Sequence, residues 1–587
     1  MSQEFLRPSQ RLSRRRFAGV VAGVAGAVAA ARGTAFAGPG FRVRAKAANA
    51  QDGAIFRMQY ANLTTLDPHF VGDGMWFVGE GLLEGLTQMS ADGKEAVPAA
   101  AESWDISEDG TTYTFHIRES GWSNGDPVTA NDFEWTYQRL LNPSFASAGN
   151  TVGANSFQPL MGITGSREYF GGTITDWEDV GITAVDEKTL EITLDAPNAE
   201  FPLLLTHPSM LPLHQATLES TDEWVLPENW VGNGAFTLES WTINTEMTLV
   251  PNEHYWDREN VQLAGIHINF AGEGAIGFEA GELDMVGLQP ADIIRFQADP
   301  ELADMLKSAP AGSVGYLAKL RSKNPILDDI NIRKALSLGM DRDVVGTVQP
   351  QTRVARQLIP DSVAGVDPEH DTPFDLEQAR QLLADAGYPN GEGFPEIKIL
   401  HGVESIAVEA LADTWREHLG INVKVDLVEP GVYVERRWAV QEEDYIGFYF
   451  GTFGSPPAWS AWVGNLWSPQ FMQELSLPQE IWAEYQAVQN DIELDPAERN
   501  EQLAALRAEH ASEETKAFEE AALKVSTLSD SEEQMAAFRE AARIRQESYL
   551  VLPFFYNDAY WAQQPNVEGI NYLQGGVHFY YKTITKS

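Results

Sequence analysis

Apolar and polar positions alternate with a period of two in several short runs of the first half of the chain. The clearest runs span residues 111–117, 189–194 and 247–250. Such alternation predicts β-strands with one buried face, and turn residues such as Asn124 and Gly125 separate the runs. Because helical periodicity is sparser here, we expect the first half to be rich in strands.

The second half has a helical period instead. Asp375 is an N-cap residue with Gln378 in the capping-box position, and Gly387 follows the last apolar residue of this predicted helix. A second predicted helix, at 408–419, leads into an alternating strand at 421–427. The two apolar stripes are Ala379, Leu382, Leu383 and Ala386, and Val408, Leu411, Trp415 and Leu419. This succession of helix and strand predicts a separate α/β lobe.

The last part of the chain changes character twice. Residues 496–546 are acidic, rich in alanine and helical in period, whereas residues 551–556 and 578–581 are aromatic and β-like. We expect this end to rejoin the first lobe.

The first residues have the order of an export signal. Arg14 and Arg15 precede an apolar run at 18–31, and Ala35-Phe36-Ala37 offers a cleavage site. The run has about 14 residues, fewer than the roughly 20 that a membrane-spanning helix needs. The sequence therefore predicts a twin-arginine signal peptide at 1–37, followed by a flexible spacer at 38–52.

Composition narrows the classes of function. The chain has no cysteine, which excludes disulfides, thiolate sites and a lipid-modified cysteine. Residues 1–50 hold nine of the 41 Lys and Arg and one of the 85 Asp and Glu, so the rest has a charge near 32 − 84 = −52. Such a charge repels nucleic acid. We expect a soluble, exported monomer, periplasmic or extracellular, without cofactor or metal.

Motifs of catalysis are missing from the sequence. The glycines of 272–277 match a dinucleotide fingerprint, but the expected second strand with its terminal acid does not follow. No nucleophile elbow and no metal-spaced histidine pair occurs. Aromatic residues gather instead in a turn-rich segment, and they suit a pocket for peptide side chains or sugar faces. They are Phe448, Tyr449, Phe450, Phe453, Trp459, Trp462 and Trp467.

Several stretches in succession resemble the family 5 extracellular solute-binding proteins of ABC importers. The most specific lies at 98–118 and continues at 122–133. Others are Leu66-Asp67-Pro68-His69-Phe70, Leu83-Glu84-Gly85-Leu86, Gly232-Asn233-Gly234-Ala235-Phe236, Asn252-Glu253-His254-Tyr255-Trp256-Asp257, the segments 279–284, 327–342 and 379–388, and Leu552-Pro553-Phe554-Phe555-Tyr556-Asn557. The similarity spans nearly the whole mature chain, with the poorest match at 145–177 and 494–546.

The resemblance implies a two-lobed periplasmic-binding-protein fold of α/β class, type II, with a hinge and an extra subdomain. Lobe I would comprise residues 53–310, with the subdomain at about 88–225, and lobe II residues 311–547. Residues 548–587 would return to lobe I. Closure is expected about crossings at 309–315 and 545–550.

The resemblance also implies a function in which no bond is broken. The chain would capture a solute, with an oligopeptide as the leading hypothesis, and deliver it to the transmembrane subunits of an ABC permease. An oligosaccharide receptor is the alternative, and an exported hydrolase is a third hypothesis without a supporting motif. The ligand-binding residues are predicted to be Phe70, Trp76, Glu84, Asn324, Phe450, Thr452, Phe453, Gly454, Trp459 and Trp462.

One departure from the family concerns the end of the ligand. In the family's peptide binders, an aspartate in the loop after the strand that here spans 444–451 pairs with the peptide's ammonium group. Here Phe453 stands at that position, and residues 451–459 contain no acid. Either Glu84 or Asp73 replaces the aspartate, or charge plays little part. In the second case Phe450, Phe453, Trp459 and Trp462 would stack on the ligand.

Overall fold

A computed structural model describes most of the chain beyond the leader. It covers residues 53–587 except 62, 64, 70–80, 144–159, 161, 350, 361–362, 364–365, 367–369, 440, 455–476, 478, 490–493, 495, 511, 528–530, 574–575 and 579. The predicted signal peptide and spacer lie outside the described residues. None of the described helices combines the length and apolar character that a bilayer-spanning segment needs.

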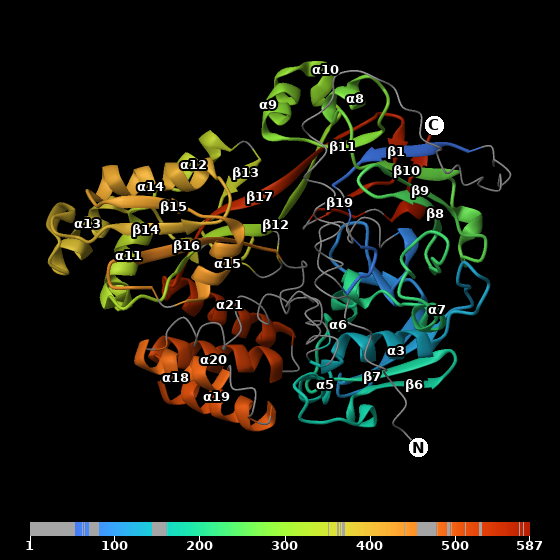
Figure 1. The fold of residues 1–587 in the computed structure, drawn as a ribbon, viewed down its shortest axis with the longest axis horizontal. Coiled ribbons are helices and arrows are strands. Elements are labelled where there is room, and N and C mark those ends of the chain that lie inside the picture. Colours follow the sequence, from blue (N-terminus) through green and yellow to red (C-terminus); the bar gives the residue numbers. More distant parts are fainter. Residues whose placement is uncertain are drawn as a thin grey trace, which may run out of the picture. The chain divides into compact units, whose positions relative to one another are not determined.

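A sheet of eleven strands runs through both lobes (Figure 1), in the order β15-β14-β16-β12-β17-β11-β1-β10-β9-β8, with β13 beside β17. β12 and β17 are its long central strands and belong to both lobes. The bounds are β1 (Ile55–Gln59), β8 (Phe236–Thr242), β9 (Glu246–Pro251), β10 (Gly265–Asn269), β11 (Met285–Gly287), β12 (Leu306–Lys319), β13 (Thr352–Val354), β14 (Ile397–His401), β15 (Val423–Leu427), β16 (Ile446–Gly454) and β17 (Val551–Gln563).

The first lobe adds a four-stranded antiparallel sheet in the order β4-β5-β7-β6, packed on α3. Alternation explains β5, because Tyr113, Phe115 and Ile117 are buried and the residues between them are not. Its further elements are β2 (Thr87–Met89), β3 (Ala96–Pro98), β4 (Ala101–Ile106), β5 (Thr112–Ile117), α3 (Ala130–Leu141), α5 (Ser166–Phe170), η2 (Trp177–Asp179), β6 (Ile182–Asp186), β7 (Thr189–Thr193), α6 (Phe201–Leu204), η3 (Pro208–Met210), α7 (Gln215–Ser220), η4 (Arg258–Asn260), α8 (Ala275–Glu279), α9 (Pro290–Ala298) and α10 (Pro300–Ala303).

The second lobe has helices on both faces of its sheet. Phe448 packs with Trp415 of α14 on one face, and Tyr449 belongs to the core that α20 and α21 cover on the other. Its helices are η5 (Pro325–Asp328), α11 (Ile330–Leu338), α12 (Asp343–Val348), α13 (Leu376–Asp385), η7 (Pro389–Gly391), α14 (Ile406–Leu419), α15 (Pro430–Trp438), α18 (Gln479–Gln489), α19 (Pro496–His510), α20 (Glu513–Thr527) and α21 (Ser531–Glu547).

Local chemistry accounts for these helices as the sequence predicts. The carboxylate of Asp375 accepts a hydrogen bond from the backbone N–H of Gln378 at 2.9 Å, and Gly387 adopts a φ of 95° after the helix. All four residues of the predicted stripe of α14 are buried. In the acidic region 496–546 the structure places the three helices α19, α20 and α21.

The chain returns to the first lobe inside β17. Residues 551–557 of this strand pair with the second-lobe part of β12, and residues 561–563 pair with β11. In this pairing β17 passes from the second lobe to the first near Asp558 as one continuous strand, whereas the sequence predicts a crossing at 545–550 and a boundary at 547/548. The remaining elements are β18 (Val567–Glu568), β19 (Asn571–Leu573), β20 (Gly576–His578), η8 (Tyr581–Thr583) and β21 (Thr585–Lys586).

Candidate functional site

The two lobes are joined where β12 and β17 change register. Ala309 pairs with Ala559 and Ser313 with Asn557, so residues 310–312 of β12 stand opposite a single residue of β17, Asp558. Such a bulge interrupts the ladder and allows the strand to bend. We call residues 309–313 and 557–559 the crossing.

A side chain of the second lobe fixes the β17 side of the crossing. The carboxylate of Asp558 pairs with Arg353 of β13, with the Arg353 Nε 2.9 Å from Oδ2 and 3.1 Å from Oδ1. The backbone N–H of Asp558 donates to the carbonyl of Gln351 at 3.0 Å. Asp558 is thereby anchored to the second lobe.

Strand direction decides which edge of the second lobe lies near the crossing. β16 runs antiparallel to β12, and its last residue Gly454 pairs with Ser313. β14 and β15 run in the direction of β16. The carboxyl ends of all three strands therefore lie at the end of the sheet nearest the crossing. In open α/β sheets, ligands bind outside the carboxyl ends of the strands.

Phe450, which the sequence predicts to contact a ligand, is packed inside the second lobe. It is 8% exposed and belongs to the core with α14. Its ring centroid lies 4.6 Å from that of His401, 5.8 Å from Phe554 and 6.1 Å from Phe555. Alternation along β16 places Phe450 on the same buried face as Phe448, which explains its burial.

Two polar side chains, those of Tyr433 and His401, contact Phe450 near the carboxyl ends of β14 and β16. The phenol of Tyr433 in α15 donates to the carbonyl of Phe450 at 2.5 Å. His401, the last residue of β14, is 1% exposed, and burial lowers the pKa of its imidazole from 6.5 to about 4. At neutral pH His401 is therefore an uncharged ring inside the second lobe.

Glu84, the predicted partner of a ligand amine, is engaged within the first lobe. Its carboxylate accepts hydrogen bonds from Tyr255 at 2.5 Å, from the indole of Trp256 at 2.8 Å and from Lys582 at 3.2 Å. Burial raises the pKa of the Tyr255 phenol, and the neighbouring charge of Glu84 raises it further. The phenol therefore keeps its proton and donates it to the hydrogen bond with Glu84. The Glu84 carboxylate thus receives its three hydrogen bonds from groups of the protein itself.

The stretches that carry the resemblance meet in this Glu84 cluster. Asn233 brackets the backbone of Glu84, accepting from its N–H at 2.9 Å and donating to its carbonyl at 2.9 Å. Arg118 lies 3.7 Å from the ring centroid of Trp256. Segments around residues 84, 233 and 255, which carry the resemblance, therefore contact one another in the first lobe.

The other predicted ligand residues have three outcomes. Asn324 caps η5, since its side-chain oxygen accepts from the N–H of Ile326 at 3.1 Å. Thr452 and Gly454 lie at the end of β16 beside the crossing, and Thr452 is exposed. The side chain of Phe453, and the residues Phe70, Asp73, Trp76, Trp459 and Trp462, lie outside what the structure describes.

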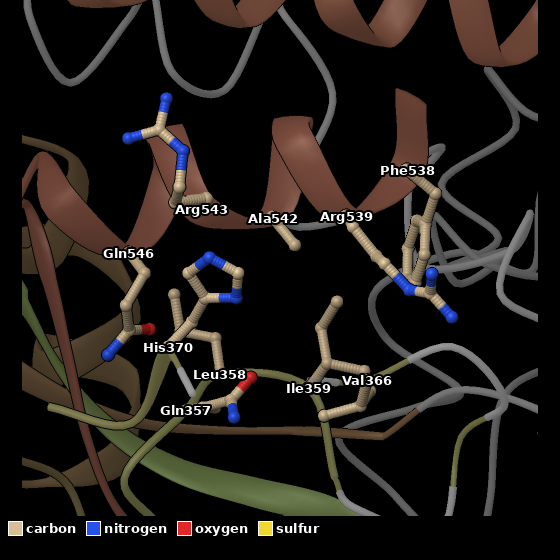
Figure 2. A pocket seen from close by; sticks show the side chains of 10 residues that line it. All are labelled: Gln357, Leu358, Ile359, Val366, His370, Phe538, Arg539, Ala542, Arg543 and Gln546. Carbon is tan, nitrogen blue, oxygen red and sulfur yellow. The ribbon is translucent and has the colours of Figure 1, made fainter. Parts of the chain in front are cut away.

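A small cavity lies between α21 and residues 357–370 (Figure 2). Its volume of about 10 Å³ has room for no more than one water molecule. Figure 2 shows Arg539 and Gln546 of α21 extending toward the segment that carries His370, whereas the Arg543 side chain extends away from it. This cavity is too small for a solute. We take the end of the second-lobe sheet where β14, β15 and β16 have their carboxyl ends as the candidate site, because ligands bind there in open α/β sheets.

Residues 95–473 match the model of the bacterial extracellular solute-binding proteins, family 5, described as its middle region. The chain belongs to this family. The match includes β4–β7, the crossing on β12 and the whole parallel part of the second-lobe sheet. It ends before α18.

Curated relatives match with about 30% identity. The periplasmic oligopeptide-binding protein OppA of Escherichia coli is 30% identical over 413 residues, which cover 66% of this chain and 73% of the relative. The oligopeptide-binding protein OppA of Bacillus subtilis is 31% identical, covering 64% and 70%. The periplasmic murein peptide-binding protein MppA of Escherichia coli is 32% identical, covering 61% and 67%.

Solved structures agree over a longer span. A complex of Haemophilus influenzae OppA with RPPGFSPFR superposes with a TM-score of 0.67 at 25% identity, over 92% of this chain and 99% of that one. The murein tripeptide binding protein MppA of Escherichia coli gives a TM-score of 0.69 at 24% identity, over 92% and 99%. The fold is therefore that of two-lobed peptide-binding proteins.

Proposed function

We propose that this protein is the substrate-binding subunit of an ABC importer and that it captures oligopeptides. The observation that carries the proposal is the fold shared over 92% of the chain with a peptide complex of a family member. The curated relatives with the names of oligopeptide and murein peptide receptors support the same class of ligand. The protein breaks no bond in its ligand, and the permease partners supply the transport.

Closure of the lobes is the proposed mechanism. Among the described residues, β12 and β17 carry the chain from one lobe to the other, and we place the φ and ψ changes of closure at the register shift between Ala309 and Ser313. A peptide that contacts both lobes binds the closed form better than the open form. It therefore shifts the population toward the form that a permease can recognise.

The amino end of the ligand is held with little help from charge in this proposal. Residues 451–459 contain no acid, and the carboxylate of Glu84 already accepts three hydrogen bonds inside the first lobe. Breaking that arrangement to pair with a ligand ammonium group would leave Lys582 buried without its partner. We propose instead that Phe453, Trp459 and Trp462 contact the ligand.

Calorimetry with peptides and oligosaccharides of matched size tests the ligand class. We expect at least one peptide of two to nine residues to bind and to raise the melting temperature. At a concentration of 100 times Kd, the free energy of unfolding should rise by about 2.7 kcal/mol. Binding of an oligosaccharide and of no peptide would transfer the protein to the alternative class.

Acetylation of the peptide's amino end tests the role of charge. For a peptide that binds, we expect the acetylated form to bind with an affinity within about tenfold of the free form, about 1.4 kcal/mol. A hundredfold loss would mean that an acid pairs with the ammonium group after all, and Asp73 would then be the first candidate.

Export through the twin-arginine route is part of the proposal. Arg14 and Arg15 stand before the apolar run 18–31, in the order that this route requires. Replacement of both by lysine should leave the precursor inside the cell. A variant found outside in normal amounts would contradict the proposed route and leave the ligand class untouched.

A further inference from the structure

Exposed apolar residues are concentrated at one edge of the second lobe. Among the described residues, twelve large apolar side chains are exposed, and five of them lie at the end of β15 or in the segments that follow β14 and β15. These five are Val403 (61% exposed), Ile406 (60%), Leu427 (49%), Val432 (42%) and Val434 (51%), and we call the first four the apolar edge. A gathered set of this kind marks a binding surface more often than scattered single residues do.

The apolar edge is a local cluster, since its two segments are in contact. Leu427 is the direct neighbour of His401 across β14 and β15. The N–H of Val428 donates to the carbonyl of His401 at 2.8 Å. A Cβ on Gly402 would lie 2.9 Å from the ring of Tyr433, so the residue before Val403 is packed against the residue after Val432.

This edge lies on the side of the sheet that ends at the crossing. β14 and β15 share the direction of β16, whose carboxyl end pairs with β12 at Ser313. The apolar edge therefore continues the candidate site outward from the crossing, across two further strands. A ligand held beside Thr452 at the end of β16 would extend along it.

The position of Tyr433 explains why these apolar side chains remain exposed. Its ring packs on Gly402 and its hydroxyl is bound to the carbonyl of Phe450, which fixes the first turn of α15 over the strand ends. Val432 consequently faces away from the core. Glu404 and Glu429 are exposed in the same two segments, and Glu429 caps α15 through the N–H of Gly431 at 3.1 Å.

We propose that the apolar edge is a subsite that selects ligands by an aliphatic side chain. This inference rests on the proposed peptide-binding function and names the preferred peptides: those with leucine-like residues at the position that meets the edge. Burial of an apolar side chain against Leu427 and Val432 removes both surfaces from water when the lobes close. Glu404 and Glu429 repel an acidic side chain at the same place, so glutamate should be the least tolerated residue.

The test is calorimetry on a set of alanine pentapeptides in which each position in turn carries Leu, Ser or Glu. At one position of the peptide we expect Leu to bind at least tenfold tighter than Ser, and Glu to bind weakest. In the triple variant Val403→Ser, Leu427→Ser and Val432→Ser this preference should fall to threefold or less. The control Ile276→Ser with Ile294→Ser, in exposed residues of α8 and α9, should retain it.

The outcomes separate this inference from the function on which it rests. If no peptide of two to nine residues binds, the proposed function fails, whereas binding of other peptides and of none of these pentapeptides would overturn the subsite alone. If Leu, Ser and Glu peptides bind alike, or if the triple variant keeps the full preference, peptide binding stands and the subsite is wrong. Unchanged binding together with lost uptake in the triple variant would assign the edge to the permease and would also overturn the subsite. Melting temperatures near that of the wild type show that the variants are folded.

Discussion

Glu84 in the first lobe and Phe450 in the second are both predicted from the sequence to contact a ligand. In the structure, their surroundings differ in chemistry. Both residues have side chains suited to a ligand, and both are turned inward. Glu84 is held by three donors, whereas Phe450 is held by the rings of His401, Phe554 and Phe555. Glu84 is therefore held in the first lobe by an ion pair and hydrogen bonds, and Phe450 is held in the second lobe by packing in an apolar core.

This difference teaches where to look for the ligand. A buried residue whose contacts are complete supports the fold, whatever its side chain could do on a surface. The apolar edge is the reverse case, because Leu427 and Val432 are apolar side chains of a common type that are exposed to solvent. Exposure, and not residue type, distinguishes the candidate contacts of the second lobe.

The largest effect is expected from removing the acid of the first region. Glu84→Ala leaves Lys582 buried without its anionic partner, and a broken buried pair costs about 3–5 kcal/mol of unfolding free energy. Chemical denaturation measures the change, with Glu404→Ala as an exposed control that should stay within about 0.5 kcal/mol. A stable Glu84→Ala protein that had lost affinity for amine-bearing peptides would instead make Glu84 a ligand residue.

Removal of the ring in the second region is expected to cost slightly less. Phe450→Ala opens a cavity between His401 and Phe554, with a loss of about 3 kcal/mol. The affinity of the folded variant for a peptide should change less than threefold, because the ring does not reach the candidate site. A loss of affinity with unchanged stability would restore the prediction that Phe450 stacks on the ligand.

A smaller effect is expected from low pH, which should destabilise the region around Phe450 through His401. Burial lowers the pKa of His401 to about 4, whereas an unfolded histidine titrates near 6.5. Between these values the unfolded chain binds the extra proton, so stability present above pH 6.5 is lost as the pH falls toward 4. His401→Gln should remove on the order of 2–3 kcal/mol of this acid sensitivity.

Denaturant titrations at pH 7 and pH 4.5 measure that difference, and His116→Gln is the control, because the side chain of His116 is 39% exposed. Both variants should keep part of the loss of stability with falling pH, since burial also lowers the pKa of His69 to about 3 and of His207 to about 4. Equal slopes in the His401 variant and the wild type would place His401 in contact with water.

Much of the fold could be predicted from the sequence, because its signals are local. The cap at Asp375 and the alternation around Phe115 are read from neighbouring residues and recur in the structure. The resemblance reached further. Arg342 is fully buried and donates to the carbonyl of Pro553, so two matched stretches far apart in the chain hold each other.

The site could be predicted less well, because exposure depends on tertiary packing. Leu427 belongs to an alternating apolar strand whose Val423 is buried, yet it is 49% exposed, because β15 is the outermost strand of its sheet and Leu427 is the last residue of β15. The rule that ligands lie outside the carboxyl ends of parallel strands could have pointed to it. No local pattern could show that the carboxylate of Glu84 meets Lys582, almost at the other end of the chain.

Closure on a ligand is the central claim, and small-angle X-ray scattering tests it most directly. The protein is measured alone and with the tightest-binding peptide at saturation, and a non-binding peptide of the same length is the control. We expect the radius of gyration to fall only with the bound peptide, because the crossing at 310–312 and Asp558 allows the lobes to close on it. An unchanged radius of gyration at proven saturation would contradict closure.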